Sequence, residues 1–170
     1  YLFYEGNVVK SGGCVRGLVV FWSDTTVTAV DANGTVAFSV VDSIMISMAI
    51  EGSVVYVTTG SPNDYGPGYL AAFHAPSGRV IFNVSVPCTS TAIARPVTSD
   101  LDTPSAVWLG CINSNQGSIW DGRTGAFVAH TVQPDGPNAQ AGMQVVATRS
   151  AIVALLRPDG VTGRGFGISW

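Results

Sequence analysis

The sequence has little charge. Lys, Arg, Asp and Glu together make up 11% of its 170 residues, against about 25% in an average soluble domain. The net charge is −3 and the eight Lys and Arg residues are scattered, so the chain lacks the basic patch that nucleic-acid binding requires. No apolar run approaches the ~18 residues of a membrane-spanning helix, so we expect a chain that does not span a membrane.

Helical patterns are also lacking. No segment keeps a 3.6-residue apolar period between capping residues, so we expect very little helix. Short runs instead alternate: in 79–86 every second residue is Val or Phe. A helix is the competing interpretation for 43–50, but Ile44, Ile46 and Ile50 share a period of two, which favours a strand.

The alternating runs predict a series of strands separated by short turns. The predicted strands are 7–10, 18–22, 26–31, 35–40, 43–50, 54–58, 69–74, 79–86, 91–98, 106–111, 116–121, 126–132, 143–148, 151–156 and 163–170, after an apolar run at 1–4 and a turn at 5–7.

Turn glycines mark a repeat. Asp31-Ala32-Asn33-Gly34, Ala75-Pro76-Ser77-Gly78 and Arg123-Thr124-Gly125 place their glycines 44 and 47 residues apart. Four-stranded units of about 40–50 residues are typical of propeller blades. We therefore predict an all-β, single-domain β-propeller of about four four-stranded blades, or part of a larger propeller. The expected blades are 7–41, 42–87, 88–133 and 142–170, the last completed by strand 1–5.

The fourth unit shows only three strands, so its outer edge needs a partner. We expect Tyr1–Glu5 to pair with Gly163–Trp170. Pairing within one chain would close a four-bladed ring, and this version is favoured. Pairing between chains would build a filament. The alternative is an arc of a larger propeller.

The second unit carries a resemblance to a known family. Its residues 54–57 (VVYV), 69–78 (YLAAFHAPSG) and 79–82 (RVIF) resemble one repeat of the quinoprotein alcohol dehydrogenase-like (PQQ-like) propeller superfamily. Residues 26–38 are similar, with a turn one residue shorter, and 118–125 is a more diverged match. The resemblance covers most of 17–132 and implies a propeller fold.

The chain departs from the family's catalytic members, which hold a quinone beside a vicinal cysteine pair and a bound calcium ion. No two cysteines are adjacent here, and Phe38 and Phe82 stand where the family has Trp. A full enzyme ring also has about twice as many blades as this chain could supply. We therefore expect a non-enzymatic member with no catalytic residues, no metal and no cofactor.

The three cysteines are Cys14, Cys88 and Cys111. Cys88 follows the outer strand of one unit and Cys111 ends a strand of the next, so a Cys88–Cys111 disulfide would join neighbouring blades. Two buried free thiols are the alternative. Cys14 is left over, free or paired with another chain.

Two N-x-[ST] triplets begin at Asn33 and Asn83. Asn33 lies at an Asn-Gly turn, and Asn83 lies on the outward side of an alternating strand, so N-linked glycans are expected at both. Together with the low charge, these acceptors favour a secreted or cell-surface protein. The alternative is an intracellular propeller with unused triplets.

Three further groups of residues are weighed as sites. The hairpin insertion with Asn63, Asp64 and Tyr65 is a candidate recognition loop, or a solvated hairpin extension. The Asp100-Leu101-Asp102 run lacks the 6–8 oxygen ligands of a calcium loop, and a capped turn is favoured. His74 and His130 have no second ligand at metal spacing and are interpreted as ordinary strand residues.

The combined prediction is a non-catalytic extracellular glycoprotein propeller that serves as a binding or structural assembly module. Its expected partners are proteins, including further copies of itself in a polymer. The alternatives are a fragment of a larger secreted quinoprotein-like enzyme and an intracellular scaffold propeller.

Overall fold

The fold is all-β in the computed structural model of the chain. The structure describes residues 3–4, 7–8, 11–15, 17–23, 25–41, 45–61, 64–87, 93–94, 106–110, 116–132, 144–147, 151–156 and 164–169. All regular elements in these ranges are strands, and every pairing between them is antiparallel. No helix that could cross a membrane occurs in the part of the chain that the structure describes.

Three four-stranded sheets follow one another in sequence order. Sheet one contains β3 (Ser11–Val15), β4 (Leu18–Trp22), β5 (Thr26–Val30) and β6 (Val36–Val41). Sheet two contains β7 (Met45–Glu51), β8 (Val54–Ser61), β9 (Asp64–His74) and β10 (Arg79–Val86). Sheet three contains β11 (Ile93–Ala94), β12 (Ala106–Gly110), β13 (Gln116–Asp121) and β14 (Phe127–Val132).

A three-stranded sheet and a hairpin complete the chain. Sheet four contains β15 (Gln144–Ala147), β16 (Ala151–Leu156) and β17 (Arg164–Ser169). The hairpin pairs β1 (Phe3–Tyr4) with β2 (Asn7–Val8).

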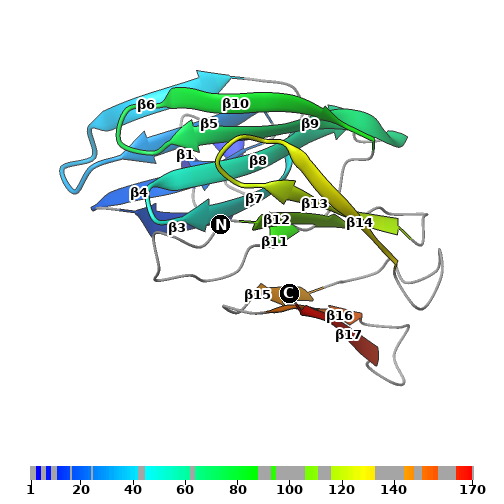
Figure 1. Ribbon diagram of the computed structural model, residues 1–170. Coiled ribbons are helices and arrows are strands. Elements are labelled where there is room, and N and C mark those ends of the chain that lie inside the picture. Colours follow the sequence, from blue (N-terminus) through cyan, green and yellow to red (C-terminus); the bar gives the residue numbers. More distant parts are fainter. Residues whose placement is uncertain are drawn as a thin grey trace.

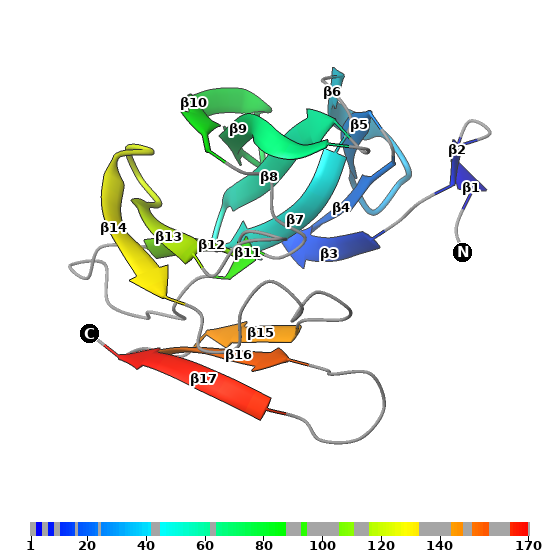
Figure 2. The same cartoon turned by 90° about the vertical axis from the view of Figure 1, so that its right-hand side faces the viewer.

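The sheets are arranged as blades of a propeller. The first strands β3, β7, β11 and β15 lie towards a common centre, and β3 contacts β7, β7 contacts β11 and β11 contacts β15 (Figures 1 and 2). The last strands of the sheets lie at the periphery (Figure 2). The predicted fold class, an all-β propeller of four-stranded antiparallel blades, is confirmed.

The first strand of sheet one differs from the prediction. The prediction placed the first strand of this unit at 7–10 and no strand between 10 and 18, whereas Ser11–Val15 is strand β3. Sheet packing explains the glycine at position 13, because a Cβ there would lie 2.8 Å from Cδ1 of Ile50 in sheet two. Glycine inside a strand often marks such a close approach.

The predicted pairing of the chain ends within one molecule is wrong for the described residues. Phe3 pairs with Val8 and Tyr4 with Asn7, whereas β17 pairs with β16. A local hairpin closes a far shorter loop than a contact between the two ends of the chain, so its entropic cost is lower. A single chain does not test the version in which the pairing occurs between molecules.

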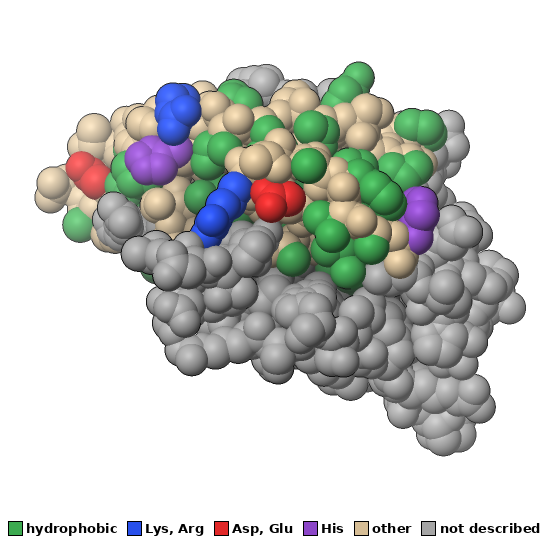
Figure 3. Space-filling model, viewed as in Figure 1, with side chains coloured by type: hydrophobic (Ala, Val, Ile, Leu, Met, Phe, Trp, Pro, Cys, Tyr) green, Lys and Arg blue, Asp and Glu red, His purple; other side chains and the backbone are tan. Residues whose placement is uncertain are grey.

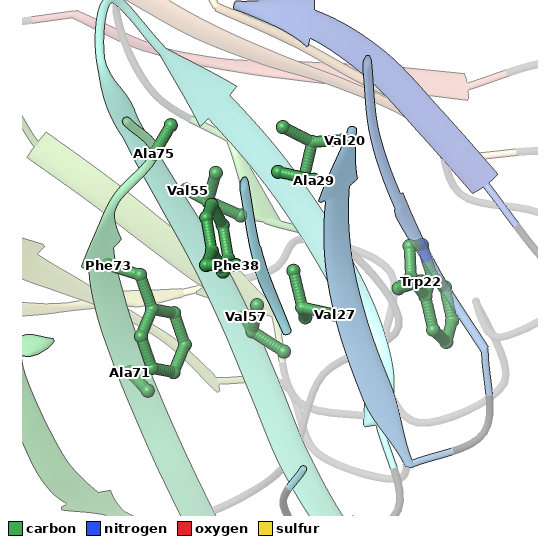
Figure 4. Packing of buried hydrophobic residues seen from close by; sticks show 10 residues of the cluster. All are labelled: Val20, Trp22, Val27, Ala29, Phe38, Val55, Val57, Ala71, Phe73 and Ala75. Atoms are coloured by element: carbon green, nitrogen blue, oxygen red, sulfur yellow. The ribbon is translucent and has the colours of Figure 1, made fainter. Parts of the chain in front are cut away.

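Apolar side chains fill the space between consecutive sheets. Between sheets one and two the buried cluster comprises Val20, Trp22, Val27, Ala29, Phe38, Val55, Val57, Ala71, Phe73 and Ala75 (Figure 4). Between sheets two and three it comprises Tyr56, Leu70, Ala72, Phe82, Val86, Val107, Leu109 and Trp120. Strand β8 serves both clusters because successive side chains point to opposite faces of a sheet. Sheet two is therefore buried on both faces.

A turn glycine fits against an aromatic side chain at each of these two interfaces. A Cβ on Gly78 would lie 2.8 Å from Cβ of Phe38 in the preceding sheet, and a Cβ on Gly125 would lie 2.6 Å from Cδ2 of Phe82. Both glycines have positive φ angles, 65° and 72°, which favour glycine on conformational grounds as well. At both interfaces a turn glycine therefore packs against a phenylalanine of the preceding sheet.

Candidate functional site

The outer strands carry a repeated exposed apolar position. Val36, Val80 and Phe127 each lie two residues after a turn glycine, and 43%, 50% and 48% of their surfaces are exposed. They pair with Val30, Phe73 and Trp120, next to a register shift in each sheet. We call Val36, Val80 and Phe127 the rim residues. Large apolar side chains that recur on a surface with little charge are suited to contact with another protein.

Aromatic side chains extend the rim on sheet three. The ring of Phe127 meets that of Trp120 edge-on, with centroids 5.4 Å apart, and lies 4.7 Å from the imidazole of His130. Val128 beside them is also exposed. Figure 3 shows hydrophobic side chains spread over one face of the molecule, with few charged groups between them. Aromatic side chains are enriched in protein interfaces.

The turns before the outer strands use acidic side chains to order the backbone. Oδ1 of Asp31 accepts hydrogen bonds from the N–H groups of Asn33 (2.8 Å) and Thr35 (2.9 Å). Oδ1 of Asp121 accepts from the N–H groups of Arg123 and Thr124 and from the Thr124 hydroxyl. These contacts are Asx turns, and they give both carboxylates a structural role.

The same contacts set the acidity of Asp121. Its partial burial alone would raise the pKa of the carboxyl group. The N–H groups of Thr124 and Arg123, the Thr124 hydroxyl and the positive charge of Arg123 outweigh that effect and lower the pKa below its ordinary value. A carboxyl group held in its ionised form is a poor proton donor, so Asp121 is not suited to act as a general acid.

His74 occupies the corresponding place in sheet two. Its Nδ1 lies 2.8 Å from Oγ of Ser77, and its backbone carbonyl oxygen accepts hydrogen bonds from the N–H groups of Ser77 and Gly78. The residue therefore stabilises the turn into β10. Among the described residues, no three His, Cys, Asp or Glu side chains are grouped so as to hold a metal ion.

Both predicted glycan acceptors lie on the surface. Asn33 is exposed in the turn between β5 and β6, and Asn83 is exposed on β10, the outer strand of sheet two. Ser85, the third residue of the second triplet, is exposed as well. Both asparagines are thus accessible to a glycan, and glycosylation itself stays a prediction.

The candidate recognition loop is shorter than expected. Asp64 and Tyr65 belong to β9, and Asp64 pairs with Ser61 of β8, so the two strands extend into the predicted insertion. Asn63 lies outside the described residues. A role in recognition stays a prediction for this end of sheet two.

Several other predicted sites fall outside the description. Cys88, Cys111, Asp100 and Asp102 are not among the described residues, so the disulfide stays a prediction. Cys14 is exposed and free on β3.

The rim and its aromatic extension were not predicted, although the recurrence of an apolar residue two positions after each turn glycine is visible in the sequence.

Comparison with solved structures identifies the fold. The chain matches the WD40 domain of coronin from Toxoplasma gondii with a TM-score of 0.63 at 18% identity, over 89% of this chain and 40% of that one. It matches BamB from Moraxella catarrhalis with a TM-score of 0.54 at 15% identity, over 85% and 39%. A quinohemoprotein alcohol dehydrogenase from Pseudomonas putida matches with a TM-score of 0.53 at 16% identity, over 93% and 30%.

These matches support a β-propeller fold for a chain that spans about two fifths of the length of the coronin and BamB chains. Identities this low show the fold alone. No family model matches the sequence, and neither does any curated protein.

Proposed function

We propose that this chain is a non-catalytic propeller module of an extracellular glycoprotein and that it acts by binding protein partners or by assembly. The observation that carries the proposal is the rim: Val36, Val80 and Phe127 present large apolar side chains at one repeated position of three outer strands. Burial of such side chains in an interface is favourable at about 25 cal/mol per Å².

Two further observations support this proposal. Asp31, His74 and Asp121 lie at the turns that precede the outer strands β6, β10 and β14. The side chain of each one makes a hydrogen bond within its turn. Among the matched propellers, BBS1N was solved in complex with ARL6DN, with a TM-score of 0.58 at 15% identity, over 82% of this chain and 42% of that one. The low charge and the exposed Asn33 and Asn83 are consistent with a glycosylated surface.

Site-specific photo-crosslinking in the secreting cell tests the proposal. A photoreactive phenylalanine analogue at position 127 should crosslink the chain to a protein, because the rim residue lies in the interface. The same analogue at Ala32, an exposed turn residue, is the control and should give far less crosslinking. Equal crosslinking at both positions, or none at position 127, contradicts a rim interface.

The enzyme alternative has its own measurement. The matched quinohemoprotein dehydrogenase shares the fold with this chain, so quinone-dependent oxidation of alcohols is the activity to assay. The purified chain, supplied with quinone and Ca²⁺, should show no alcohol oxidation above the protein-free rate. Turnover that depends on the quinone would overturn the non-catalytic proposal, whatever the crosslinking shows.

A further inference from the structure

A register shift places Asn83 on the same face of sheet two as the rim residue Val80. Val80 pairs with Phe73 of β9. Beyond the shift, Asn83 pairs with Ala71 of the same strand. Paired residues share a face of the sheet, and both Phe73 and Ala71 belong to the cluster between sheets one and two. In a regular strand, residues three apart point to opposite faces, so the shift is what makes Val80 and Asn83 neighbours.

Tyr69 lies next to Asn83 on the same face, further along the sheet. It pairs with Ser85, and no register shift separates Ser85 from Asn83. Tyr69 is therefore a diagonal neighbour of Asn83, and such residues lie about 7–8 Å apart, within reach of an aromatic side chain. Val80 and Tyr69 are each 50% exposed. The exposed Asn83 is thus flanked by two exposed, largely apolar side chains.

The equivalent positions of sheet three show how close such neighbours come. Phe127 is the rim residue of that sheet, and His130 follows it by three residues, again beyond a register shift. Their rings are 4.7 Å apart between centroids. A group attached at the position of Asn83 can therefore contact the rim residue of its own sheet.

A glycan on Asn83 has chemical groups that suit both flanking side chains. The first sugar of an N-linked glycan is N-acetylglucosamine, whose ring has apolar C–H faces and whose acetyl group ends in a methyl. These groups pack on aromatic and aliphatic side chains, while the hydroxyl groups of the sugar stay in water. Removal of the exposed apolar surface of Val80 and Tyr69 from water is favourable.

We propose that the N-linked glycan of Asn83 covers Val80 and Tyr69, with its first N-acetylglucosamine stacked on the Tyr69 ring. This proposal rests on the proposed glycoprotein and deepens it, because it assigns an occupant to the exposed apolar surface of sheet two. The occupant is the chain's own glycan, since the acceptor and both side chains lie on one face.

Sheet three keeps an open apolar rim under this proposal. The sequence between 88 and 132 has no N-x-[ST] triplet, and His130 stands at the position equivalent to Asn83. Phe127 and Val128 therefore retain exposed surfaces of 48% and 58%. Of sheets two and three, only sheet three is then available for protein contact at the rim.

Hydroxyl-radical footprinting of the purified, secreted chain measures the cover over Tyr69. Oxidation of Tyr69 should be roughly threefold slower in the wild type than in Asn83→Gln, because the bulky sugar excludes the radical. Asn33→Gln is the matched control: it removes the other predicted glycan and should leave Tyr69 oxidation at the wild-type rate.

Phe127 is the reference residue in these samples, because 48% of its surface is exposed, against 50% for Tyr69. Its oxidation rate should be the same in all three chains. Equal rates for Tyr69 in the wild type and in Asn83→Gln overturn the proposal. Protection that Asn33→Gln removes to the same extent also overturns it.

NMR of the same glycosylated chain distinguishes stacking from shielding by a sugar that makes no fixed contact. Protons above the face of an aromatic ring resonate upfield, so signals of the first N-acetylglucosamine on Asn83 should be shifted upfield. Tyr69→Phe keeps the ring and should keep this shift, whereas Tyr69→Leu should abolish it. Nuclear Overhauser effects should also connect this sugar with the Val80 methyl groups. Sugar signals that Tyr69→Leu leaves in place contradict the stacking, and the absence of contacts to Val80 contradicts the cover.

These outcomes are separable from those of the proposed function. A glycosylated chain in which Tyr69 is unprotected, but which crosslinks to a protein through position 127, overturns only the glycan contact. A protected Tyr69 in a chain that gives no crosslinks at position 127, or that shows quinone-dependent turnover, overturns only the proposed function.

Discussion

The hydroxyl group of Tyr56 in sheet two donates a hydrogen bond of 2.8 Å to the carbonyl oxygen of Gly122, in the turn that joins β13 and β14 of sheet three. Tyr56 is 1% exposed, and Gly122 is buried as well. The bond therefore joins two consecutive blades in an apolar environment, beside the ring of Phe82, whose centroid lies 6.4 Å from that of Tyr56.

Replacing this hydroxyl should weaken the junction of sheets two and three. Tyr56→Phe keeps the ring but removes the donor from a buried carbonyl, so we expect a loss of about 1–3 kcal/mol in the free energy of unfolding. Tyr69→Phe is the control, because Tyr69 is half exposed, and its change should stay within about 0.5 kcal/mol. Urea unfolding of both variants measures the difference. Equal effects would contradict a specific role for the Tyr56 bond.

The docking of Gly125 on Phe82 predicts an unequal response to added methyl groups. Gly125→Ala and Gly34→Ala both place alanine at a positive φ, but only the first drives a Cβ into a phenylalanine. We expect Gly125→Ala to lower the free energy of unfolding by about 1–3 kcal/mol more than Gly34→Ala does. Thermal and urea unfolding provide the comparison. A similar loss in both variants would show that backbone strain alone determines the effect.

The lowered pKa of Asp121 predicts a pH-dependent contribution to stability. A carboxyl group whose pKa is lower in the folded state stabilises the fold above its unfolded pKa, which is about 3.9 for Asp. That contribution disappears as the pH falls through the folded value. Asp121→Asn should thus be less stable than the wild type at pH 7, with a gap that narrows as the pH falls below about 4. Urea midpoints between pH 2.5 and 7 test this, and a gap independent of pH would contradict it.

Glycosylation should occur at both exposed acceptors when the chain is produced in a secretory host. Asn83→Gln and Asn33→Gln should each lower the intact mass by one glycan, and Ser85→Ala should have the same effect as the first. Ser85→Thr is the control and should keep the glycan, because threonine also completes the triplet. An unmodified mass for the wild-type protein would remove the support for an extracellular location.

The sequence was sufficient for most strands, because their signal is local. The predicted strands 18–22, 79–86, 116–121 and 151–156 coincide with β4, β10, β13 and β16. Of these, 79–86 alternates strictly, whereas 18–22 and 151–156 are short apolar runs bounded by polar residues or glycine. Strand β3 was missed because Ser11, Gly12 and Gly13 are weak strand formers, and only the approach of Ile50 explains the glycine at position 13. The start of β9 was missed for a similar reason: Gly66, Pro67 and Gly68 are typical of a loop. In the structure Asp64 pairs with Ser61 of β8 and Gly68 pairs with Val86 of β10, so this segment lies within β9.

The surfaces proposed for function could not be derived from local patterns. Val19 and Val55 look alike in sequence, and only the packing of whole sheets makes one exposed and the other buried. Val80 and Val84 both lie on an alternating strand, but a register shift after Val80 separates their environments. The exposure of the rim residues thus depends on strand register and sheet packing, which the local sequence does not show.

Native mass spectrometry of the secreted protein, mixed with quinone and Ca²⁺, tests most directly whether the chain acts through protein contacts rather than through catalysis. We expect glycosylated chains in complexes with further copies or with another protein, and no quinone bound. A single chain that carries one quinone and one Ca²⁺, with no protein partner at any concentration, would contradict this account.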